Sequence, residues 1–228
     1  MTSNCYRVGV DEAGRGSLIG EMIIGIAAVP CDIIGFIEEI GVRDSKELTP
    51  NARSKLYHLF YREIPFITVP VKPIEIDSDN LGIVTKNAIL KGLQLLSKKI
   101  NPLLVETITI DRFGKERNIR TGIRRLGFKK AMIRIEEKAD KKYPEVSLAS
   151  VIAKYIRDKR IAIINSLLGL SGSGYPSDEE TILSLEEKVT DNKLGKLNGY
   201  IRLSWSTVEK LGLKQSKKRK SKTLDDYF

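Results

Sequence analysis

The feature that most constrains the fold is a β-rich segment that runs into two adjacent acids and then into a glycine-rich turn. Residues 6–11 alternate in polarity and predict a strand that ends in acid. The turn at residues 13–20 follows, and the apolar residues 22–29 predict a buried second strand. Two strands in direct succession predict a hairpin, with Asp11 and Glu12 where the first strand meets the turn.

The rest of the chain alternates between helical and strand patterns. A third strand is predicted at residues 66–72, and Pro70 places it at a sheet edge because proline cannot donate to a central ladder. Further elements are predicted as follows: helices at 50–63, 79–99 and 147–167, capped by Thr49 before Pro50 in the first and by Ser147 in the last, and strands at 104–110 and 131–136. Three strands in a meander, followed by helix–strand units, predict an α/β protein with a mixed sheet flanked by helices.

Composition divides the 228-residue chain into three parts. Residues 1–170 carry the sheet, and the 41% hydrophobic content of the chain is enough to bury a core. A Gly/Ser-rich break then opens a smaller helical segment at residues 171–213. Residues 214–228 are basic and poor in apolar side chains, which predicts a flexible tail.

The net charge of +10 does not come only from the tail. Without residues 214–228 the chain keeps 33 basic and 27 acidic residues, a charge of +6. A basic body favours a polyanionic partner, because Lys and Arg displace counterions from phosphates. A solvated, lysine-rich surface explains the same charge equally well, so charge alone leaves both interpretations open.

The scarce residue types exclude several classes of protein. Cys5 and Cys31 are too few for a disulfide framework, so we expect a reducing, cytoplasmic environment. With His58 as the one histidine, a zinc site of the usual nitrogen and sulfur ligands and a histidine-based nuclease are both disfavoured. The sequence shows neither a signal peptide nor an apolar run of membrane-spanning length, so we expect no membrane association.

Four acids lie at or just beyond predicted strand ends: Asp11, Glu12, Asp111 and Asp140. Strand ends form the crevice where such sheets bind ligands. Clustered carboxylates favour a hard cation such as Mg²⁺ or Mn²⁺, since like charges without a metal raise one another's pKa. Two ions about 4 Å apart would suit phosphodiester cleavage. Because successive strand residues point to opposite faces, Asp11 and Glu12 share a site only if the strand bends.

The turn after the acids provides the most specific motif. Gly14 and Gly16 permit positive φ and close approach of a ligand, while Arg15 between them can donate to a phosphate or a sugar. A dinucleotide-binding loop is disfavoured, because the glycines lead into a strand instead of a helix.

These residues resemble ribonuclease HII in its archaeal form. The resemblance rests on the following segments, in the family's order: residues 10–16, Asp44-Ser45-Lys46, Ile110-Asp111, residues 139–144, residues 147–154, residues 174–178, and Arg202 with Trp205. It implies a ribonuclease H-like fold with a five-stranded mixed sheet and a C-terminal helical segment. It also implies two-metal-ion hydrolysis of RNA in RNA/DNA hybrids and cutting at single ribonucleotides in duplex DNA, with 3′-hydroxyl and 5′-phosphate ends.

The resemblance further implies a role for each site residue. The catalytic metal ligands would be Asp11, Glu12, Asp111 and Asp140. Gly14, Arg15 and Gly16 would read the ribose 2′-hydroxyl, Tyr175 would pack on the next deoxyribose, and Lys46 would hold a phosphate. Outside this set, we interpret Arg202 and Trp205 as a packing pair, and we expect Lys141, Lys142 and Lys154 either to line the phosphate path or to be solvated.

The last eight residues, 221–228, resemble the peptide by which replication and repair proteins bind a DNA sliding clamp. One helical turn would bring Leu224, Tyr227 and Phe228 to one side as an apolar plug. Ser221 stands where that peptide usually has glutamine, which lowers the expected affinity. This resemblance implies a role in DNA replication and repair. We also expect the enzyme to be monomeric.

Two rival functions remain. One is a nucleic-acid binding module with the same fold and an inactive site, which the intact set of four acids disfavours. The other is a different nuclease of the ribonuclease H-like superfamily, such as a resolvase. The turn at residues 14–16 and Tyr175 favour an enzyme that reads a ribonucleotide.

Overall fold

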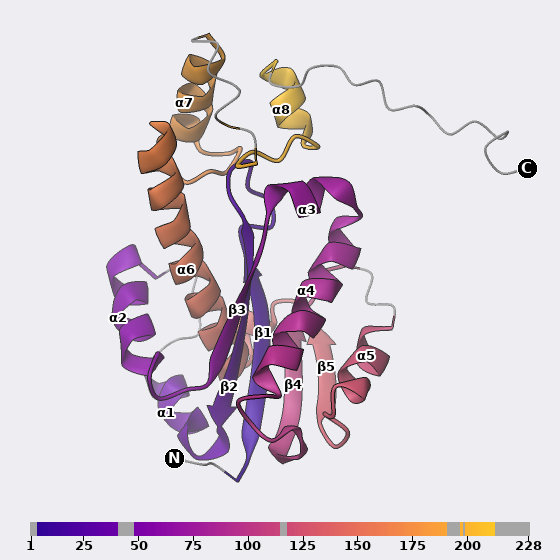
Figure 1. Ribbon diagram of the computed structural model, residues 1–228. Coiled ribbons are helices and arrows are strands. Elements are labelled where there is room, and N and C mark those ends of the chain that lie inside the picture. The colour runs from indigo at the N-terminus through magenta and orange to yellow at the C-terminus, as the bar shows by residue number, and fades with distance from the viewer. Residues whose placement is uncertain (1–3, 41–47, 115–117, 191–196, 198, 213–228) are drawn as a thin grey trace, which may run out of the picture.

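The protein folds around one five-stranded mixed sheet with the strand order β3-β2-β1-β4-β5 (Figure 1). This computed structural model describes residues 4–40, 48–114, 118–190, 197 and 199–212. The strands are β1 (Tyr6–Ala13), β2 (Met22–Pro30), β3 (Phe66–Val71), β4 (Val105–Asp111) and β5 (Met132–Glu136). Strands β1, β2 and β3 pair antiparallel, whereas β4 is parallel to both β1 and β5. The predicted mixed sheet, the meander and the edge position of Pro70 are confirmed.

Helices cover both faces of the sheet. They are α1 (Ile34–Glu39), α2 (Pro50–Phe60), α3 (Pro73–Ser78), α4 (Leu81–Leu96), α5 (Ile119–Arg125), α6 (Pro144–Leu168), α7 (Glu179–Thr190) and α8 (Ser206–Lys210), with short 3-10 turns η1 (Cys31–Ile33), η2 (Pro102–Leu104) and η3 (Ala139–Lys141). One core lies between the sheet and α4 and α5, and a second lies between the sheet and α1, α2 and α6. No helix in the described part of the chain has the length and apolar character that crossing a membrane requires.

Helix boundaries follow local capping chemistry. The hydroxyl of Thr49 accepts a hydrogen bond from the Ala52 N–H at 3.2 Å, which confirms the predicted cap. The prediction that Ser147 caps the last long helix is wrong. Helix α6 begins at Pro144, with Tyr143 as its N-cap, because proline is well suited to the first helical position. Ser147 is therefore a buried residue within α6.

Helix α6 lies unusually close to the centre of the sheet. A Cβ atom on Gly9 of β1 would stand 2.0 Å from the Glu145 carbonyl oxygen, and one on Gly25 of β2 would stand 2.4 Å from that of Ala149. Both contacts are shorter than real Cβ atoms tolerate, so only glycine allows this approach. The first turns of α6 therefore lie directly against β1, beside its two acids.

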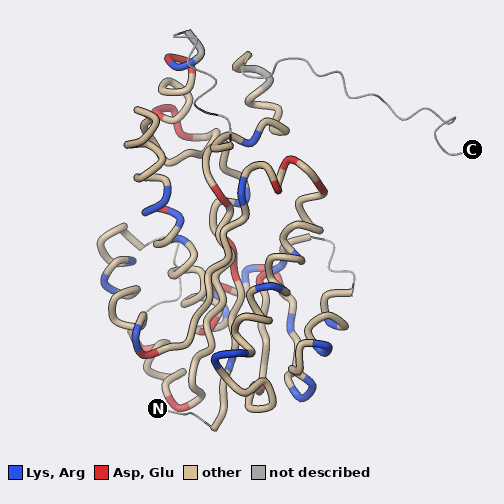
Figure 2. The backbone as a smooth tube through the Cα atoms, viewed as in Figure 1, with Lys and Arg blue, Asp and Glu red and all other residues tan. Residues whose placement is uncertain are grey.

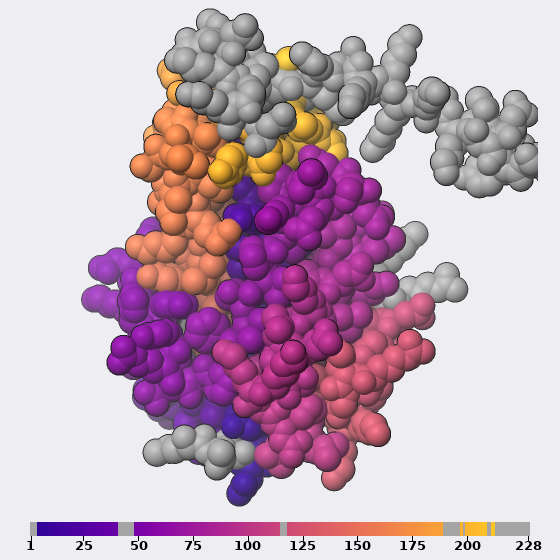
Figure 3. Space-filling view, in the orientation of Figure 1, coloured from indigo at the N-terminus to yellow at the C-terminus, as the bar shows by residue number. Residues whose placement is uncertain are grey.

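The C-terminal segment packs on the turn between β1 and β2. Leu18 and Ile19 of the turn share a third core with residues of α6, α7 and α8, among them Ile161, Leu185 and Val208. Ile19 also forms an antiparallel bridge with Ile201. Figure 3 shows this segment in orange and yellow above the indigo N-terminal residues. The glycine-rich turn is thus held by a part of the chain about 180 residues away.

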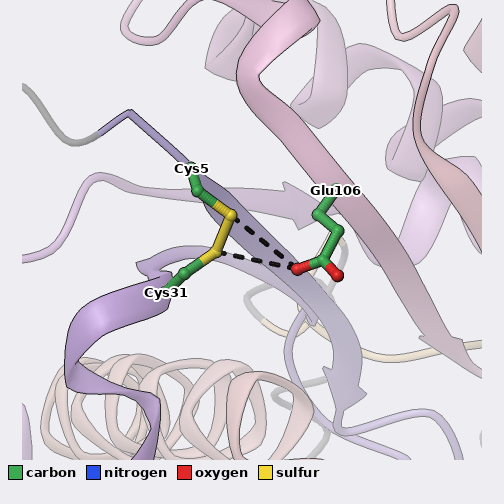
Figure 4. A group of neighbouring side chains, drawn as sticks. All are labelled: Cys5, Cys31 and Glu106. Carbon is green, nitrogen blue, oxygen red and sulfur yellow. Dashed lines mark hydrogen bonds between the residues drawn. A yellow bond between two sulfur atoms is a disulfide. The ribbon is translucent and has the colours of Figure 1, made fainter.

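Cys5 and Cys31 are joined in a single disulfide, which the expectation of a reducing environment did not anticipate (Figure 4). Strand register explains the contact: Tyr6 pairs with Pro30 across the hairpin, so the next residues outward, Cys5 and Cys31, also lie opposite each other. Their Cα atoms are 5.5 Å apart. A carboxylate oxygen of Glu106 lies 3.7 Å from one sulfur and 3.8 Å from the other. The bond closes the end of the hairpin opposite the acids.

Candidate active site

The candidate site lies where two parallel neighbouring strands, β1 and β4, end together. A cleft of about 370 Å³ opens there. It is lined by Asp11, Glu12, Ala13, Gly14, Arg15, Gly16, Asp111, Ser150, Lys154 and Tyr175. Figure 2 shows acidic residues in red along the middle of the sheet. The structure thus brings three of the four predicted acids, the glycine turn and Tyr175 to one cleft.

Asp11 and Glu12 both line the cleft although they are neighbours on one strand. Asp11 is buried, and its Oδ1 accepts a hydrogen bond from the Glu12 N–H at 2.8 Å. Burial raises the pKa of Asp11 well above its usual value, and the negative charges of Glu12 and Asp111 raise it further. A hydrogen bond with Ser150 of α6 opposes this shift. The site therefore carries crowded negative charge in a poorly solvated position.

Asp111 and Asp140 are linked through one backbone contact. Asp111 is the last residue of β4, and its Oδ1 accepts a hydrogen bond from the Ala139 N–H at 2.8 Å. Asp140 follows Ala139 in η3 and is buried. The fourth acid thus lies directly beyond the residue that holds Asp111, although it is not among the residues that line the cleft.

The donor set fits a hard divalent cation. Carboxylate oxygens are the ligands that Mg²⁺ and Mn²⁺ prefer, and burial of several carboxylates favours a cation that offsets their charge. Among the described residues, no three of the four acids place ligand oxygens within 4.8 Å of one another. Only Cys5, Cys31 and Glu106 meet that condition, and their sulfurs are already bonded to each other. The spacing of the acids is wide for one shared ion.

The glycine turn presents its backbone to the cleft. Gly14 has φ +80°, in the region that favours glycine, as expected. Gly16 does not use the positive φ that glycine permits, and a Cβ atom there would meet nothing within 4 Å. The Arg15 guanidinium folds back along the cleft wall, 3.4 Å from the Glu12 carboxylate and bonded to the Phe113 carbonyl.

Tyr175 reaches the turn from the C-terminal segment. Its hydroxyl accepts a hydrogen bond from the Gly14 N–H at 3.1 Å. The buried guanidinium of Arg157, on α6, lies over its ring at 4.4 Å from the ring centroid. Arg157 also donates to the Ser173 carbonyl oxygen at 2.5 Å. The ring is therefore fixed on one face by a cation and at its tip by the turn.

Arg202 holds the glycine turn, a structural role that the sequence analysis did not predict. It does lie near Trp205, 5.9 Å from the ring centroid, as the packing interpretation expected. However, its fully buried guanidinium also donates to the carbonyl oxygens of Gly14 and Arg15, both at 2.6 Å, and of Gly20 at 3.2 Å. Burial lowers its pKa to about 10, and the nearby positive charge of Arg157 adds to the shift. No local pattern signals these bonds, because their acceptors are backbone atoms of a distant turn.

The remaining predicted residues fall in different places. Lys154 lines the cleft, whereas Lys142 pairs with Glu136 at 3.2 Å. His58 lies beside Tyr155, 3.3 Å from its hydroxyl, which agrees with a structural role. Lys46 and the three tail residues Leu224, Tyr227 and Phe228 lie outside the described residues.

Known proteins share both the sequence and this arrangement. The family model described as Ribonuclease HII matches residues 8–208. A protein named Ribonuclease HII from Aeropyrum pernix is 39% identical over 229 residues, which cover 97% of each chain. The crystal structure of ribonuclease H2 from Pyrococcus horikoshii superimposes with a TM-score of 0.77 at 33% identity, over 90% of this chain and 96% of that one.

A second solved structure contains a partner. It is the PCNA:RNase HII complex from Archaeoglobus fulgidus, with a TM-score of 0.74 and 27% identity over 96% of this chain and 99% of that one. The family model and the relatives cover nearly the whole chain, including the cleft and the C-terminal segment that supports it. The chain therefore belongs to the ribonuclease HII family, the nucleases that hydrolyse RNA in RNA/DNA hybrids.

Proposed function

We propose that this enzyme cuts hybrids endonucleolytically and also cuts at single ribonucleotides embedded in duplex DNA, leaving 3′-hydroxyl and 5′-phosphate ends. Such an activity would serve ribonucleotide and RNA primer removal in DNA replication and repair. One observation supports it above all: a single cleft joins the acids Asp11, Glu12 and Asp111 to the glycine turn and Tyr175. Acids suited to cleavage and groups suited to contacting a sugar would thus share one cleft.

The acids Asp11, Glu12, Asp111 and Asp140 would hold two divalent ions, Mg²⁺ or Mn²⁺. All four lie in the described part of the chain, and no three of them place ligand oxygens within 4.8 Å of one another, so they need not all hold the same ion. When bound, such ions activate the attacking water and stabilise the leaving oxygen of a phosphodiester. The protein's own contribution is to fix the acids, through the Glu12 and Ala139 N–H groups and Ser150. Lys154, on the cleft wall, would neutralise a substrate phosphate.

The glycine turn and Tyr175 would select the RNA–DNA junction. The 2′-hydroxyl both donates and accepts hydrogen bonds and is the group that distinguishes RNA from DNA. Residues 14–16 line the cleft, and no atom lies within 4 Å of a Cβ position at Gly16, which leaves its backbone open to a ligand. The Tyr175 ring would pack on the following deoxyribose and clash with a 2′-hydroxyl there. Lys46 would hold a phosphate near the scissile bond.

The deciding experiment uses duplex DNA that carries one ribonucleotide, with Mg²⁺, with Mn²⁺ and with chelator. We expect cleavage at the ribonucleotide with metal, no cleavage with chelator, and no cleavage of an all-DNA control. Metal-dependent cutting of the all-DNA duplex would favour a resolvase-like nuclease. Binding without cutting in any metal would favour the inactive binding module.

Removing the Tyr175 ring is expected to lower kcat/KM at a ribonucleotide junction. Truncating a well-packed aromatic contact residue typically costs about 2 kcal/mol, so Tyr175→Ala should cost roughly 30-fold. Tyr175→Phe keeps the ring over Arg157 but loses the acceptor of the Gly14 N–H, so we expect a smaller loss. The measurement is cleavage of junction and all-RNA hybrid substrates side by side. An unchanged preference for the junction in Tyr175→Ala would contradict the assigned role.

We further propose that the last residues, 221–228, bind a DNA sliding clamp. Support comes from the apolar residues Leu224, Tyr227 and Phe228 and from the clamp-bound relative from Archaeoglobus fulgidus. The basic residues that precede them, 214–222, would provide a linker.

Replacing Phe228 with alanine is expected to weaken clamp binding at least about 30-fold, because buried aromatic anchors contribute 2 kcal/mol or more. Ser221→Gln, which restores the usual first residue, is expected to strengthen binding. Calorimetric titration of the full chain with the clamp measures both. Neither variant should change cleavage of a short substrate in the absence of clamp. Equal affinity of Phe228→Ala and the unmodified chain would refute the clamp assignment.

A further inference from the structure

A strongly basic surface lies on the helix and strand that follow β4. Residues 119–136 contain six basic residues and one acid, a charge of +5, while the whole body up to residue 213 carries +6. The six are Arg120, Arg124, Arg125, Lys129, Lys130 and Arg134, which we call the α5–β5 basic surface. Five are exposed and Arg134 is half-buried. Figure 2 shows blue residues gathered along α5 and at the turn before β5, at lower right.

The single acid within residues 119–136 does not neutralise the charge of the α5–β5 basic surface. This acid, Glu136, hydrogen-bonds to the Lys142 ammonium at 3.2 Å and to the Tyr143 hydroxyl at 2.9 Å, at the far end of β5. Of the six basic residues, Arg134 is the one whose charge acts on Glu136, and its guanidinium lies 5.6 Å from the Tyr143 ring centroid. Within the described part of the chain, no carboxylate forms an ion pair with any of the six basic residues. Adjacent cations without counter-charges repel one another, and a polyanion relieves that repulsion.

Two of the six also have a structural task. Arg120 donates to the Ile133 carbonyl, and Arg124 donates to the Phe128 carbonyl at 2.8 Å and to that of Lys129. These bonds fix the turn between α5 and β5. The structure thus holds Lys129 and Lys130 at one end of the strand in a defined position, as a preformed binding surface requires.

The distance between the cleft and the α5–β5 basic surface limits which molecules could contact both. Glu136 pairs with Asp111 across β4 and β5, so the C-terminal end of β5 lies at the level of the acids. Lys130 lies six residues earlier, two residues before the start of β5, so it is at most about 20 Å away at 3.3 Å per extended residue. Successive base pairs are about 3.4 Å apart, so this span corresponds to at most about six base pairs.

We propose that the α5–β5 basic surface binds the backbone of the substrate duplex up to about six base pairs from the cut. This inference rests on the proposed function, because it treats the duplex in the cleft as the molecule that continues across the surface. An RNA/DNA hybrid and a DNA duplex present the same row of phosphates, and a protein surface reads neither base sequence nor sugar through phosphate contacts. The surface would therefore raise affinity for long duplexes without changing the chemistry.

The test removes three charges, those of Arg125, Lys129 and Lys130, whose side chains form no ion pair within the described part of the chain. The variant is Arg125→Gln, Lys129→Gln, Lys130→Gln, which leaves the structural Arg120 and Arg124 in place. The matched control is Lys55→Gln, Arg62→Gln, Lys159→Gln, with the same charge change at or next to α2 and α6, on the opposite face of the sheet.

Both variants are compared on duplexes that carry one ribonucleotide. The long duplex has 15 base pairs on each side of the ribonucleotide. In two shortened duplexes, one side or the other is reduced to four base pairs closed by a hairpin. For the α5–β5 variant we expect KM on the long duplex to rise roughly tenfold with kcat unchanged. The slope of log KM against log salt should fall by up to about 3, for three lost phosphate contacts. Shortening one side of the duplex should abolish the difference, and the control should behave like the unmodified enzyme.

Unchanged KM on the long duplex, an equal loss on the short one, or an equal loss in the control would each overturn the proposal. The same variants are also titrated with plain long duplex by fluorescence anisotropy in chelator, where nothing is cut. This arm tests the surface even if the enzyme fails to cleave at single ribonucleotides. Unchanged duplex affinity of the α5–β5 variant in that measurement would likewise overturn the proposal.

Discussion

The Asp11→Asn variant is expected to lose at least about 1,000-fold in cleavage rate while still binding its hybrid substrate. Asparagine is nearly the same size but removes the charge that would hold a divalent ion. A bound ion contributes several kcal/mol to stabilising the transition state, and about 4 kcal/mol corresponds to three orders of magnitude. Single-turnover cleavage with Mg²⁺, together with hybrid affinity in chelator, measures both properties.

The same variant is expected to be more stable than the unmodified enzyme in chelator at neutral pH. Burial raises the pKa of Asp11 in the folded state above its unfolded value. The stability that this group contributes is therefore fully present below the unfolded pKa and is lost as pH rises through the folded pKa. Asparagine cannot lose a proton, so its advantage should shrink on acidification.

Thermal unfolding at neutral and acidic pH, with and without Mg²⁺, tests the explanation. Glu21→Gln is a suitable control, because the Glu21 carboxylate pairs with Arg160 and its pKa is lowered by that partner. At neutral pH, Glu21→Gln should be less stable than the unmodified enzyme, whereas Asp11→Asn should be more stable. Normal turnover of Asp11→Asn would remove Asp11 from the catalytic machinery.

Replacing Arg202 with methionine is expected to lower the free energy of unfolding by about 4 kcal/mol. The change removes the charged donor from the carbonyls of Gly14, Arg15 and Gly20, and breaking a buried network typically costs 3–5 kcal/mol. The Gly14 carbonyl keeps the Ser17 hydroxyl as a donor, at 3.0 Å. For a chain of this size, that corresponds to a decrease in Tm of roughly 10 °C. Arg202→Lys should recover only part, since one ammonium lacks the planar fork that reaches three acceptors.

A purely structural role is separable from a role in catalysis. We expect the kcat of Arg202→Ala to be reduced even well below its Tm, because the turn at residues 14–16 loses its position. Added guanidinium, at a concentration that does not denature the protein, should restore part of the lost kcat. Equal concentrations of sodium chloride and urea serve as controls. If kcat stays unchanged at temperatures where the variant is folded, Arg202 only stabilises the fold.

The predictable part of this molecule is the part encoded by local patterns. All five strands were expected within two residues of their observed bounds, because each is a short apolar run between turns. The acids at strand ends were also expected to converge. They do so because the neighbouring parallel strands β1 and β4 end at the same edge of the sheet. Resemblance to a family supplied what spacing alone does not, above all the roles of Tyr175 and Asp140.

The parts that could not be predicted depend on register and on distant backbone atoms. The disulfide follows from pairing Tyr6 with Pro30, which the hairpin prediction did not specify. The close approach of α6 depends on Gly9 and Gly25, whose missing side chains leave no positive pattern. Arg202 bonds to carbonyl groups, which every residue has, so the sequence contains no information about its partners.

The contact between Arg202 and the glycine turn has a consequence for protein synthesis. A nascent chain that has emerged only as far as α6 already carries all four acids, but not the residue that holds the turn. During synthesis the turn would therefore lack its buried donor until residue 202 has left the exit tunnel. The order of synthesis would thus assemble the acids before it fixes the turn beside them.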